Sequence, residues 1–476
     1  MTSSDSTPPS LYAPREPIYP RRVSGFYRNL KWVLTAATLG IYYLTPWIRW
    51  DRGRNLPDQA VLVDMAGRRF FMFWIEIWPH EFYFVAGLLI MAGLGLFLFT
   101  SALGRVWCGY ACPQTVWTDL FILVERWIEG DRNARVRLHK ARWSLSKARL
   151  RLTKWITWLL IALATGGAWV FYFADAPTLM RDLLTGQAAF IAYGSVAFLT
   201  ATTFVFGGFA REQICIYACP WPRIQAAMMD EDTLTVGYRD WRGEPRGKHR
   251  KSEDAVALGD CIDCMACVNV CPMGIDIRDG QQMECITCAL CIDACDDVMT
   301  KIGKPRGLID YMALTDEANE RAGEPKKPVW KHVIRLRTII YTSLWSLVGI
   351  LLIVALFMRS EIDLNVSPIR NPVFVTLSDG SIRNTYDLRI RNKQGEAHPF
   401  EISVTGEDHL LVSMQGTDST TITVPADETG SHKIYLTAPK GTDAAKGTLA
   451  NIRIWVEDKV TGDRAKSDTV FHGAGH

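Results

Sequence analysis

The sequence has no cysteine after Cys295 and no histidine within any of its long apolar runs. The lack of membrane histidines argues against a haem held by two axial His ligands inside a membrane. The net charge of +3 is too small to indicate a nucleic-acid partner. The first thirty residues lack the apolar run and small-residue cleavage site of a secretory signal, and are rich in proline and arginine instead. We expect residues 1–30 to form a basic cytoplasmic tail that packs no core.

The cysteines that are present come in tight groups. All 12 fall into four groups, a usage typical of a metal or redox protein on the reducing side of a membrane. Two groups read C-x2-C-x2-C-x3-C, the bacterial two-cluster ferredoxin signature, in which the fourth cysteine binds the other cluster. This rule assigns one [4Fe–4S] cluster to Cys261, Cys264, Cys267 and Cys295, and the second to Cys285, Cys288, Cys291 and Cys271.

Zinc is the alternative for these eight residues. Four-cysteine zinc sites also use C-x2-C pairs, but two triplets each followed by a fourth cysteine at the same offset would be an odd way to build them. Pro272 follows the first quartet as the ferredoxin motif expects, whereas Asp296 takes the place of the second proline. Since this proline donates nothing to iron, the assignment is little affected.

Crossed ligation brings the clusters close together, so electron transfer is the expected function of this segment.

Five apolar runs are each about long enough to cross a membrane as a helix. They cover residues 31–50, 82–103, 155–173, 188–210 and 338–358. Basic residues crowd the loop after the second run, and the turn between the third and fourth has only Arg181. By the positive-inside rule, the 105–154 loop and the 211–337 segment face the cytoplasm. The 51–81 loop, which contains four arginines, does not fit this orientation.

The composition changes after about residue 360 to short alternating strands without cysteine. Strands of this number and spacing predict a β-sandwich of immunoglobulin size, which the odd number of spans places in the periplasm. We therefore expect a multi-domain membrane protein, with an α-helical transmembrane bundle, an inserted two-cluster ferredoxin domain and a C-terminal immunoglobulin-like β-sandwich. Its predicted parts are a tail at 1–30, a four-helix membrane region at 31–210, a cytoplasmic segment at 211–337 with the ferredoxin domain at about 255–300, a fifth span at 338–358 and the β domain at 360–476.

A second pattern follows the second and fourth apolar runs. The sequences C-G-Y-A-C-P and C-I-Y-A-C-P contain Cys108 with Cys112 and Cys215 with Cys219, and they indicate an internal repeat. If the local chain is helical, thiols at i and i+4 share one face and can bind a metal ion or form a dithiol pair. Soft thiolates favour Cu(I), zinc or iron–sulfur centres, and two facing pairs would make one four-thiol site. The alternative is that these are small buried residues at helix ends.

Weaker candidates have ordinary structural explanations beside the functional ones. Polar groups before the second span suit a metal ion but are more typical of a membrane interface, and two methionines after the second thiol pair suit a soft ion or a core. The basic 240–253 run suits an acidic donor, lipid headgroups or a solvated linker. The polar groups before the second span are Glu76, His80 and Glu81, and the two methionines are Met228 and Met229. The terminal His472 and His476 suit copper or a frayed tail.

With a double C-x3-C-P in a membrane frame, a two-cluster ferredoxin insert and a terminal β domain, nearly the whole chain resembles the FixG/CcoG family, also called RdxA or RdxB. These are accessory proteins of cbb3-type cytochrome c oxidase in the bacterial inner membrane. The resemblance implies a cupric reductase that supplies Cu(I) for oxidase assembly, together with copper transporters and chaperones. It implies cluster ligation by the eight ferredoxin cysteines, and copper handling or redox work by Cys108, Cys112, Cys215 and Cys219.

The expected function is a single-electron relay. An unidentified cytoplasmic donor reduces the two clusters, and these reduce Cu(II) held near the paired thiols, within one chain or across a homodimer. One alternative is a quinol-oxidising conduit like the membrane ferredoxin subunits of nitrate reductase systems. Another is a copper chaperone or scaffold that binds copper without turnover.

Overall fold

The computed structural model describes residues 17–475 apart from 53–55, 249–257, 326, 360–361, 394–395, 408, 417–418 and 427. The chain divides into two compact units. The first comprises Met1–Ile48 and Gln59–Leu352, and the second Arg49–Asp58 and Ile353–His476. The predicted ferredoxin segment and the long helices therefore belong to one unit, while nearly all of the predicted β domain belongs to the other.

Three helices in the described residues are long and apolar enough to cross a membrane, namely Tyr83–Leu103, Phe190–Ala218 and Leu336–Phe357. They correspond to the second, fourth and fifth predicted spans. The first and third predicted spans fall in α1 (Phe26–Leu44) and α6 (Leu145–Val170), which do not meet the same measure. Threonine, glycine and basic residues dilute the apolar stretches of both helices. The five predicted runs thus coincide with five long helices, and the crossing of a membrane by α1 and α6 stays a prediction.

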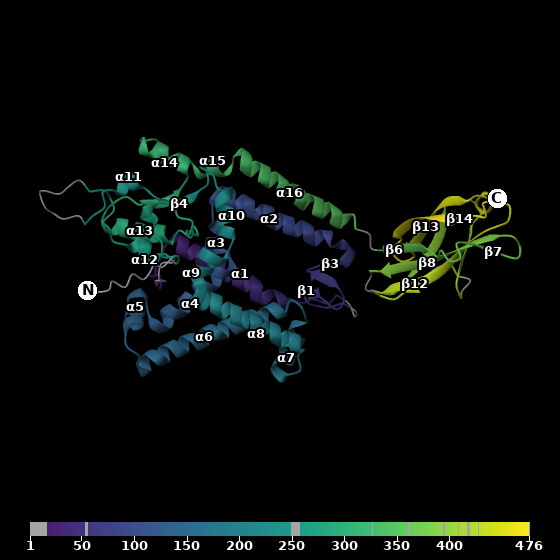
Figure 1. Cartoon of the computed structure of the whole chain (residues 1–476), viewed down its shortest axis with the longest axis horizontal. Coiled ribbons are helices and arrows are strands. Elements are labelled where there is room, and N and C mark those ends of the chain that lie inside the picture. The colour runs from purple at the N-terminus through teal and green to yellow at the C-terminus, as the bar shows by residue number, and fades with distance from the viewer. Residues whose placement is uncertain are drawn as a thin grey trace, which may run out of the picture. The chain divides into compact units, whose positions relative to one another are not determined.

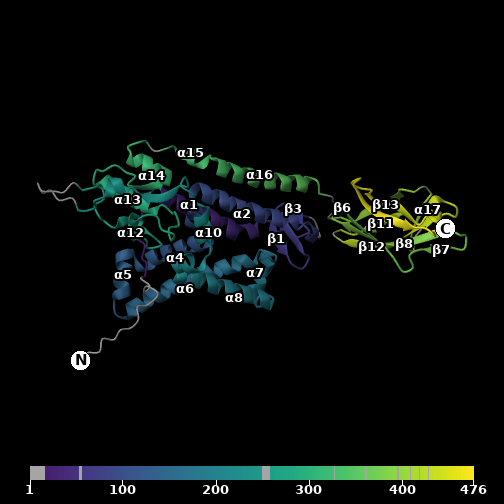
Figure 2. The ribbon, with the colours of Figure 1, turned by 45° about the horizontal axis from the view of Figure 1, so that its top comes forward.

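The long helices pack in two groups (Figure 1). One group has α6 beside α8 (Phe190–Val205), with α4 (Pro113–Glu129) against α6. The other has α2 (Tyr83–Leu103) beside α16 (Leu336–Phe357), as a turned view also shows (Figure 2).

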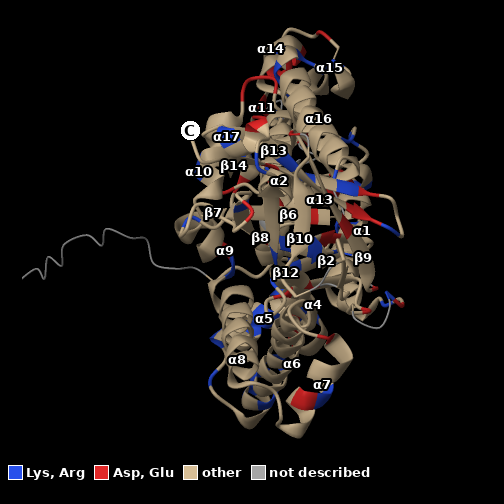
Figure 3. Ribbon diagram, turned by 90° about the vertical axis from the view of Figure 1, so that its right-hand side faces the viewer, with Lys and Arg blue, Asp and Glu red and all other residues tan. Residues whose placement is uncertain are grey.

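Glycines permit the close approach of helices in both groups. A Cβ at Gly87 would lie 2.5 Å from a methyl carbon of Leu352, and one at Gly166 would lie 2.9 Å from the backbone nitrogen of Thr200. Charge is scarce on the most apolar helices: α2 and α8 contain no Lys, Arg, Asp or Glu, and α16 contains only Arg337 (Figure 3).

The ferredoxin segment is built from short elements around two cysteine loops. Helices α12 (Ala266–Val270) and α13 (Leu290–Lys301) each begin within a cysteine triplet, and strands β4 (Thr235–Tyr238) and β5 (Ile309–Met312) pair antiparallel. Asp293 of α13 accepts hydrogen bonds from the first backbone N–H groups of α1, including that of Arg28 at 2.7 Å. This carboxylate satisfies donors that the first turn of a helix leaves free, so it ties the ferredoxin segment to the helical bundle.

Smaller elements complete the first unit. They are η1 (Thr45–Trp47), β1 (Val61–Asp64), β2 (Arg69–Met72), β3 (Ile75–Ile77), η2 (Pro79–Glu81), α5 (Arg132–Lys140), α7 (Ala176–Thr185), η3 (Phe206–Ala210), α9 (Arg211–Gln213), α11 (Asp240–Gly243), η5 (Ile277–Asp279), α14 (Leu314–Arg321) and α15 (Val329–Val333). The β1-β2-β3 sheet in the 51–81 loop has no counterpart among the elements expected from the sequence. Arg69 pairs with Glu76 across this sheet at 3.2 Å, so this arginine of the loop has a local partner.

The second unit is a β-sandwich around one apolar core. One sheet has the order β10-β12-β8-β6 with β7 on β8, and the other the order β11-β9-β13-β14. Its elements are β6 (Ile362–Pro368), β7 (Val375–Thr376), β8 (Ile382–Asn392), β9 (His398–Thr405), β10 (Leu411–Met414), β11 (Thr421–Val424), β12 (Thr429–Ala438), α17 (Asp443–Lys446), β13 (Leu449–Asp458) and β14 (Arg464–His472). Alternate residues of β8 are buried, as in a strand with one face on a core. The predicted sandwich is confirmed.

Candidate redox site

Each predicted cysteine quartet lines its own small cavity. Cys261, Cys264, Cys267 and Cys295 line one cavity, and Cys271, Cys285, Cys288 and Cys291 line the other, which Cys267 also reaches. Cysteines distant in sequence thus come together in the pattern that crossed ligation requires. The ligand assignment itself stays a prediction.

The backbone of the two cysteine loops suits an anionic cluster. Asp263 and Met265 have positive φ angles of 54° and 58°, and Thr287 and Ala289, at the same places in the second loop, have 54° and 59°. Four non-glycine residues in this conformation carry strain of the kind that functional sites retain. Successive N–H groups in such turns form concave nests that bind anions, iron–sulfur clusters among them. The backbone N–H of Thr287 points to Cys285 Sγ at 3.4 Å.

The two cavities differ in their access to solvent. Cys264 of the first quartet is exposed, whereas no cysteine of the second quartet is.

Burial raises the pKa of the Cys271 and Cys295 thiols to about 12 in each case. These thiols are neutral without iron at neutral pH, so binding of a cluster must displace their protons. The donor sets, the apolar walls and the backbone nests fit two [4Fe–4S] clusters.

The two C-x3-C pairs lie where helices break. Cys108 is in α3 (Val106–Tyr110) and Cys215 is in the π-helical turn η4 (Ile214–Ala218), while Cys112 and Cys219 have extended backbone. Pro113 is the first residue of α4, as expected for a proline that begins a new helix. Pro220 is the N-cap of α10 (Trp221–Met228). The condition of a continuous helix through each pair is therefore not met, because the proline that follows each second thiol favours extended backbone at that thiol.

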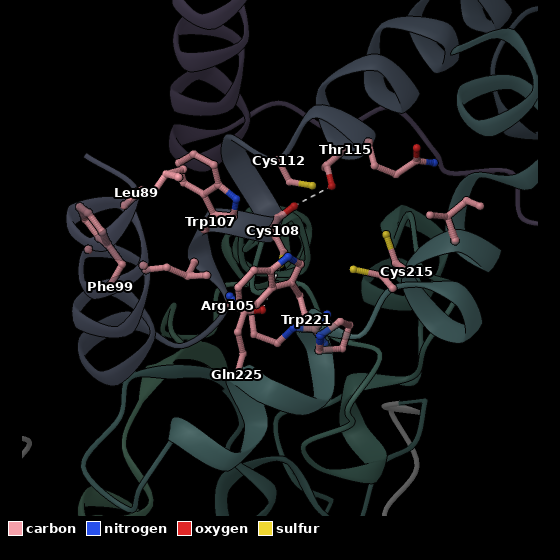
Figure 4. Close-up of a pocket in the computed structure, with 18 of the residues that line it drawn as sticks. Leu89, Phe99, Arg105, Trp107, Cys108, Cys112, Thr115, Cys215, Trp221 and Gln225 are labelled. Carbon is pink, nitrogen blue, oxygen red and sulfur yellow. Dashed lines mark hydrogen bonds between the residues drawn. The ribbon is translucent and has the colours of Figure 1, made fainter. Parts of the chain in front are cut away.

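All four paired thiols line one large cavity of ≈ 720 Å³. Its other walls come from α2, α3, α10 and Trp345 of α16. Leu89 and Phe99 lie on one side of this cavity and Cys112 and Cys215 on the other, with Arg105 and Trp221 between them (Figure 4). In the part of the chain that the structure describes, no three Cys, His, Asp or Glu side chains are close enough to hold a single metal ion. The same result covers the two cluster quartets, so the finding specific to the four paired thiols is that they share one chamber.

The first thiol pair packs directly on the second cluster loop. A Cβ at Gly109 would lie 2.6 Å from the carbonyl oxygen of Ile286 and 3.0 Å from Cys288 Cα, so a side chain does not fit there. The hydroxyl of Tyr110, a buried residue, donates to the carbonyl oxygen of Cys288 at 3.2 Å. Cys108 and Cys215 both pack against the apolar core that contains Cys288. The paired thiols and the second cluster cavity are thus adjacent.

Arg105 connects these two parts. The guanidinium donates to the carbonyl oxygen of Met283 in the second cluster loop, and the residue is only 4% exposed. The same side chain lines the thiol cavity and a neighbouring pocket of ≈ 280 Å³ that contains Cys285. Burial raises the pKa of the Cys108 thiol, and the charge of Arg105 partly opposes this. Sequence reasoning missed Arg105, Gly109, Tyr110 and Gln225. Only the glycine carried a signal, as the single difference between the two copies of the repeated motif.

The weaker candidates are mostly structural. Glu76 pairs with Arg69, and Glu81 accepts a hydrogen bond from the backbone N–H of Trp78 at 3.1 Å. Met229 lines the pocket beside Cys285, and Arg242 pairs with Asp260. Met228 ends α10, and His472 ends β14, where its backbone N–H bonds to the side chain of Asn384. The side chain of His80, residues 249–253 of the basic run and His476 lie outside the described residues.

Comparisons with known proteins agree with this geometry. A family model described as a 4Fe-4S dicluster domain matches residues 210–314, and one described as a 4Fe-4S binding domain matches residues 84–131. A third, described as the IG-like fold at the C-terminal of FixG, matches residues 352–474. The 84–131 match contains the first C-x3-C pair, and the 210–314 match contains the second pair with all eight ferredoxin cysteines.

Whole-chain relatives extend these matches. The chain is 70% identical to protein RdxB of Cereibacter sphaeroides, and the match covers 100% of both chains. It is 64% identical to protein RdxA of the same organism, over 98% of this chain and 99% of RdxA. It is 53% identical to nitrogen fixation protein FixG of Rhizobium meliloti, over 90% of this chain and 88% of FixG. Such identity over nearly the full length makes this chain a member of the RdxA/RdxB/FixG family, and with its 4Fe-4S domains it is a transmembrane iron–sulfur electron-transfer protein.

Proposed function

We propose that this protein is a cupric reductase, which converts Cu(II) to Cu(I) at the paired thiols for assembly of a cbb3-type cytochrome c oxidase. The observation that carries the proposal is the contact between Gly109 and the Ile286–Cys288 backbone, which places the first thiol pair against the second cluster cavity. Short separation between redox groups is what a one-electron step needs. The clusters, when bound, supply storage and transfer of single electrons.

The paired thiols suit copper as a substrate. Reduction converts Cu(II), a borderline ion, into Cu(I), a soft ion that thiolates bind well. Because all four thiols line one cavity, copper that binds to one pair has the other pair in the same chamber.

The two cluster cavities suggest a direction for the electrons. Because Cys264 is exposed, a soluble donor docks beside the first cluster. The second cluster lies next to the paired thiols. We propose the second quartet as the ligands of the inner cluster and the first quartet as those of the outer cluster. We also propose that the ferredoxin segment faces the cytoplasm and the β-sandwich the periplasm of the inner membrane. Copper transporters, chaperones and oxidase subunits are the partners this function requires.

The test is a double substitution, Cys108→Ser with Cys112→Ser, in the full-length protein. The expected result is unchanged cluster absorbance after anaerobic reduction by dithionite, with loss of the Cu(I) that a chromogenic chelator captures from added Cu(II). The control is Cys219→Ser, a substitution in the second pair that leaves the first pair intact. Copper reduction at the rate of the unsubstituted protein in the double variant would rule out the role of this pair. Copper binding without turnover in the unsubstituted protein would favour a chaperone.

A further inference from the structure

The thiol cavity is larger and more apolar than a copper ion requires. Its volume of ≈ 720 Å³ falls in the usual range for small-molecule sites, about 300–1,000 Å³. Much of its wall is hydrocarbon and indole, from residues including Leu89, Phe99, Trp107, Trp221 and Trp345. A hydrated metal ion gains nothing from such walls, because they offer it no oxygen or nitrogen ligands.

The cavity borders helices that suit a membrane. Two of its walls, α2 and α16, are long and apolar enough to span one. The wall residues Leu89, Phe99 and Trp345 are exposed on these helices, where a bilayer would contact them. A ligand reaching the cavity from this side arrives through hydrocarbon and must itself be lipid-soluble.

Three buried polar residues, Arg105, Thr115 and Gln225, line the cavity among the apolar ones. Gln225 is 1% exposed, accepts a hydrogen bond from Cys108 Sγ at 3.2 Å and donates to Thr100 Oγ1 at 3.4 Å. Arg105 Nε is buried and has no hydrogen-bond partner in the described part of the chain. A buried donor without a partner is costly, and an oxygen of a ligand in the cavity would satisfy it. An apolar body with an oxygen-bearing ring is the chemistry that fits this arrangement.

We propose that this cavity binds the head group of an isoprenoid quinol, which reduces the clusters from within the membrane. The inference rests on the proposed function and names a second reductant for it, beside a soluble donor at Cys264. One quinol gives two electrons and two protons: the quinone leaves, the protons pass to water, and the two clusters take one electron each. Two Cu(II) ions then take these electrons and leave as two Cu(I). Quinol oxidation, the alternative function named above, thus supplies the electrons for copper reduction.

The position of Arg105 helps this transfer. A quinol is a weaker reductant than most soluble ferredoxin donors, so the accepting cluster must have a relatively high potential. The Arg105 cation lies beside Cys285, where positive charge favours the reduced, more negative cluster. The same residue therefore provides a hydrogen-bond donor for the quinone oxygen and raises the electron affinity of the nearest cluster.

The test fills the cavity from α2. Gly93 lines the cavity and a Cβ there meets nothing within 4 Å, so Gly93→Leu places a side chain in the open space without a clash. Gly194→Leu in α8, where a Cβ also meets nothing within 4 Å, is the matched control outside the cavity. Binding of decylubiquinone to oxidised full-length protein is followed by quenching of tryptophan fluorescence, since three tryptophans line the cavity. Reduction is followed by anaerobic bleaching of the clusters with decylubiquinol.

The expected result is saturable quenching, about tenfold weaker binding in Gly93→Leu and unchanged binding in Gly194→Leu. Decylubiquinol should bleach two one-electron clusters per molecule in the unsubstituted protein and in Gly194→Leu. Quenching that Gly93→Leu leaves unchanged, or that a redox-inert lipid of the same tail length reproduces, overturns the proposal, as does the absence of bleaching. Copper reduction by dithionite-reduced protein is measured separately. If that persists while quinol neither binds nor reduces, only the quinol inference fails.

Discussion

The two C-x3-C-P motifs share their thiols and their proline but lie in different surroundings. In the first motif, Gly109 packs on the second cluster loop and Tyr110 is 5% exposed. In the second, Ile216 replaces the glycine and Tyr217 is 71% exposed. The same contrast holds three residues before the first thiol, where Arg105 of the first motif faces the cluster loop and Glu212 takes its place in the second. The first motif thus makes the tight backbone contact with the second cluster loop, while Cys215 and Ile216 of the second motif pack on the apolar core beside that loop.

This difference divides the work between the motifs. Under the proposed function, the first pair is the contact through which electrons reach copper. The second pair lines the same cavity. If the motifs were equivalent, matched substitutions in the two would have matched effects. We expect unequal effects instead, larger in the first motif than in the second.

The largest effect is expected at Gly109. In Gly109→Ala the new Cβ meets the Ile286 carbonyl oxygen, and relief of this contact costs about 1–3 kcal/mol of stability. The shift of the thiol pair away from the cluster loop slows copper reduction by roughly 10- to 100-fold. The measurement is Cu(I) capture from dithionite-reduced protein, normalised to cluster content, with thermal unfolding recorded in parallel. Gly167→Ala in α6, where a Cβ meets nothing within 4 Å, is the control. Equal rates in the two variants would show that close packing at Gly109 is irrelevant.

A smaller effect is expected at Arg105. Loss of this cation in Arg105→Gln lowers the potential of the second cluster by about 60 mV, which is 1.4 kcal/mol for one electron. The first cluster, which is not in contact with Arg105, keeps its potential. A redox titration monitored by electron paramagnetic resonance separates the two clusters, and Arg105→Lys, which keeps the charge, should retain most of the original value. A shift of both clusters by the same amount would contradict a local effect of this charge.

The smallest effect is expected at the tyrosines. Tyr110→Phe removes the hydrogen bond to the Cys288 carbonyl oxygen and costs about 0.5–1.5 kcal/mol. Tyr217→Phe is its matched partner in the second motif, and its side chain is exposed, so we expect no measurable change. The temperature at which cluster absorbance is lost reports both. A larger loss in Tyr217→Phe than in Tyr110→Phe would reverse the assignment of the two motifs.

The sequence was sufficient for what depends on local spacing. The C-x2-C-x2-C-x3-C repeats predicted two quartets, and each quartet lines one cavity. The alternating strands predicted the β-sandwich because one buried face imposes a period of two. Asp296, which replaces the expected proline, accepts a hydrogen bond from the backbone N–H of Gly307 at 2.9 Å, a structural role that its sequence position does not reveal.

What depends on packing between distant segments could not be predicted from the sequence. The contact of Gly109 with Ile286 joins residues far apart in the chain. The glycine distinguishes the first motif from the second but does not show which segment packs against it. The thiol cavity needs Trp345 of α16 as well as the motifs themselves, so no local pattern encodes it. The number of spans was also beyond composition alone, because α1 and α6 lie below the hydropathy that identifies a span.

The most direct test of the central claim follows copper and clusters together in the unsubstituted protein. Anaerobic, dithionite-reduced protein, freed of excess reductant, is mixed with Cu(II), frozen at short times and examined by electron paramagnetic resonance. For a cupric reductase we expect the Cu(II) signal and the reduced-cluster signals to disappear together, with one Cu(I) formed for each cluster oxidised. A Cu(II) signal that persists beside reduced clusters would contradict it, since the thiols would then bind copper without receiving electrons.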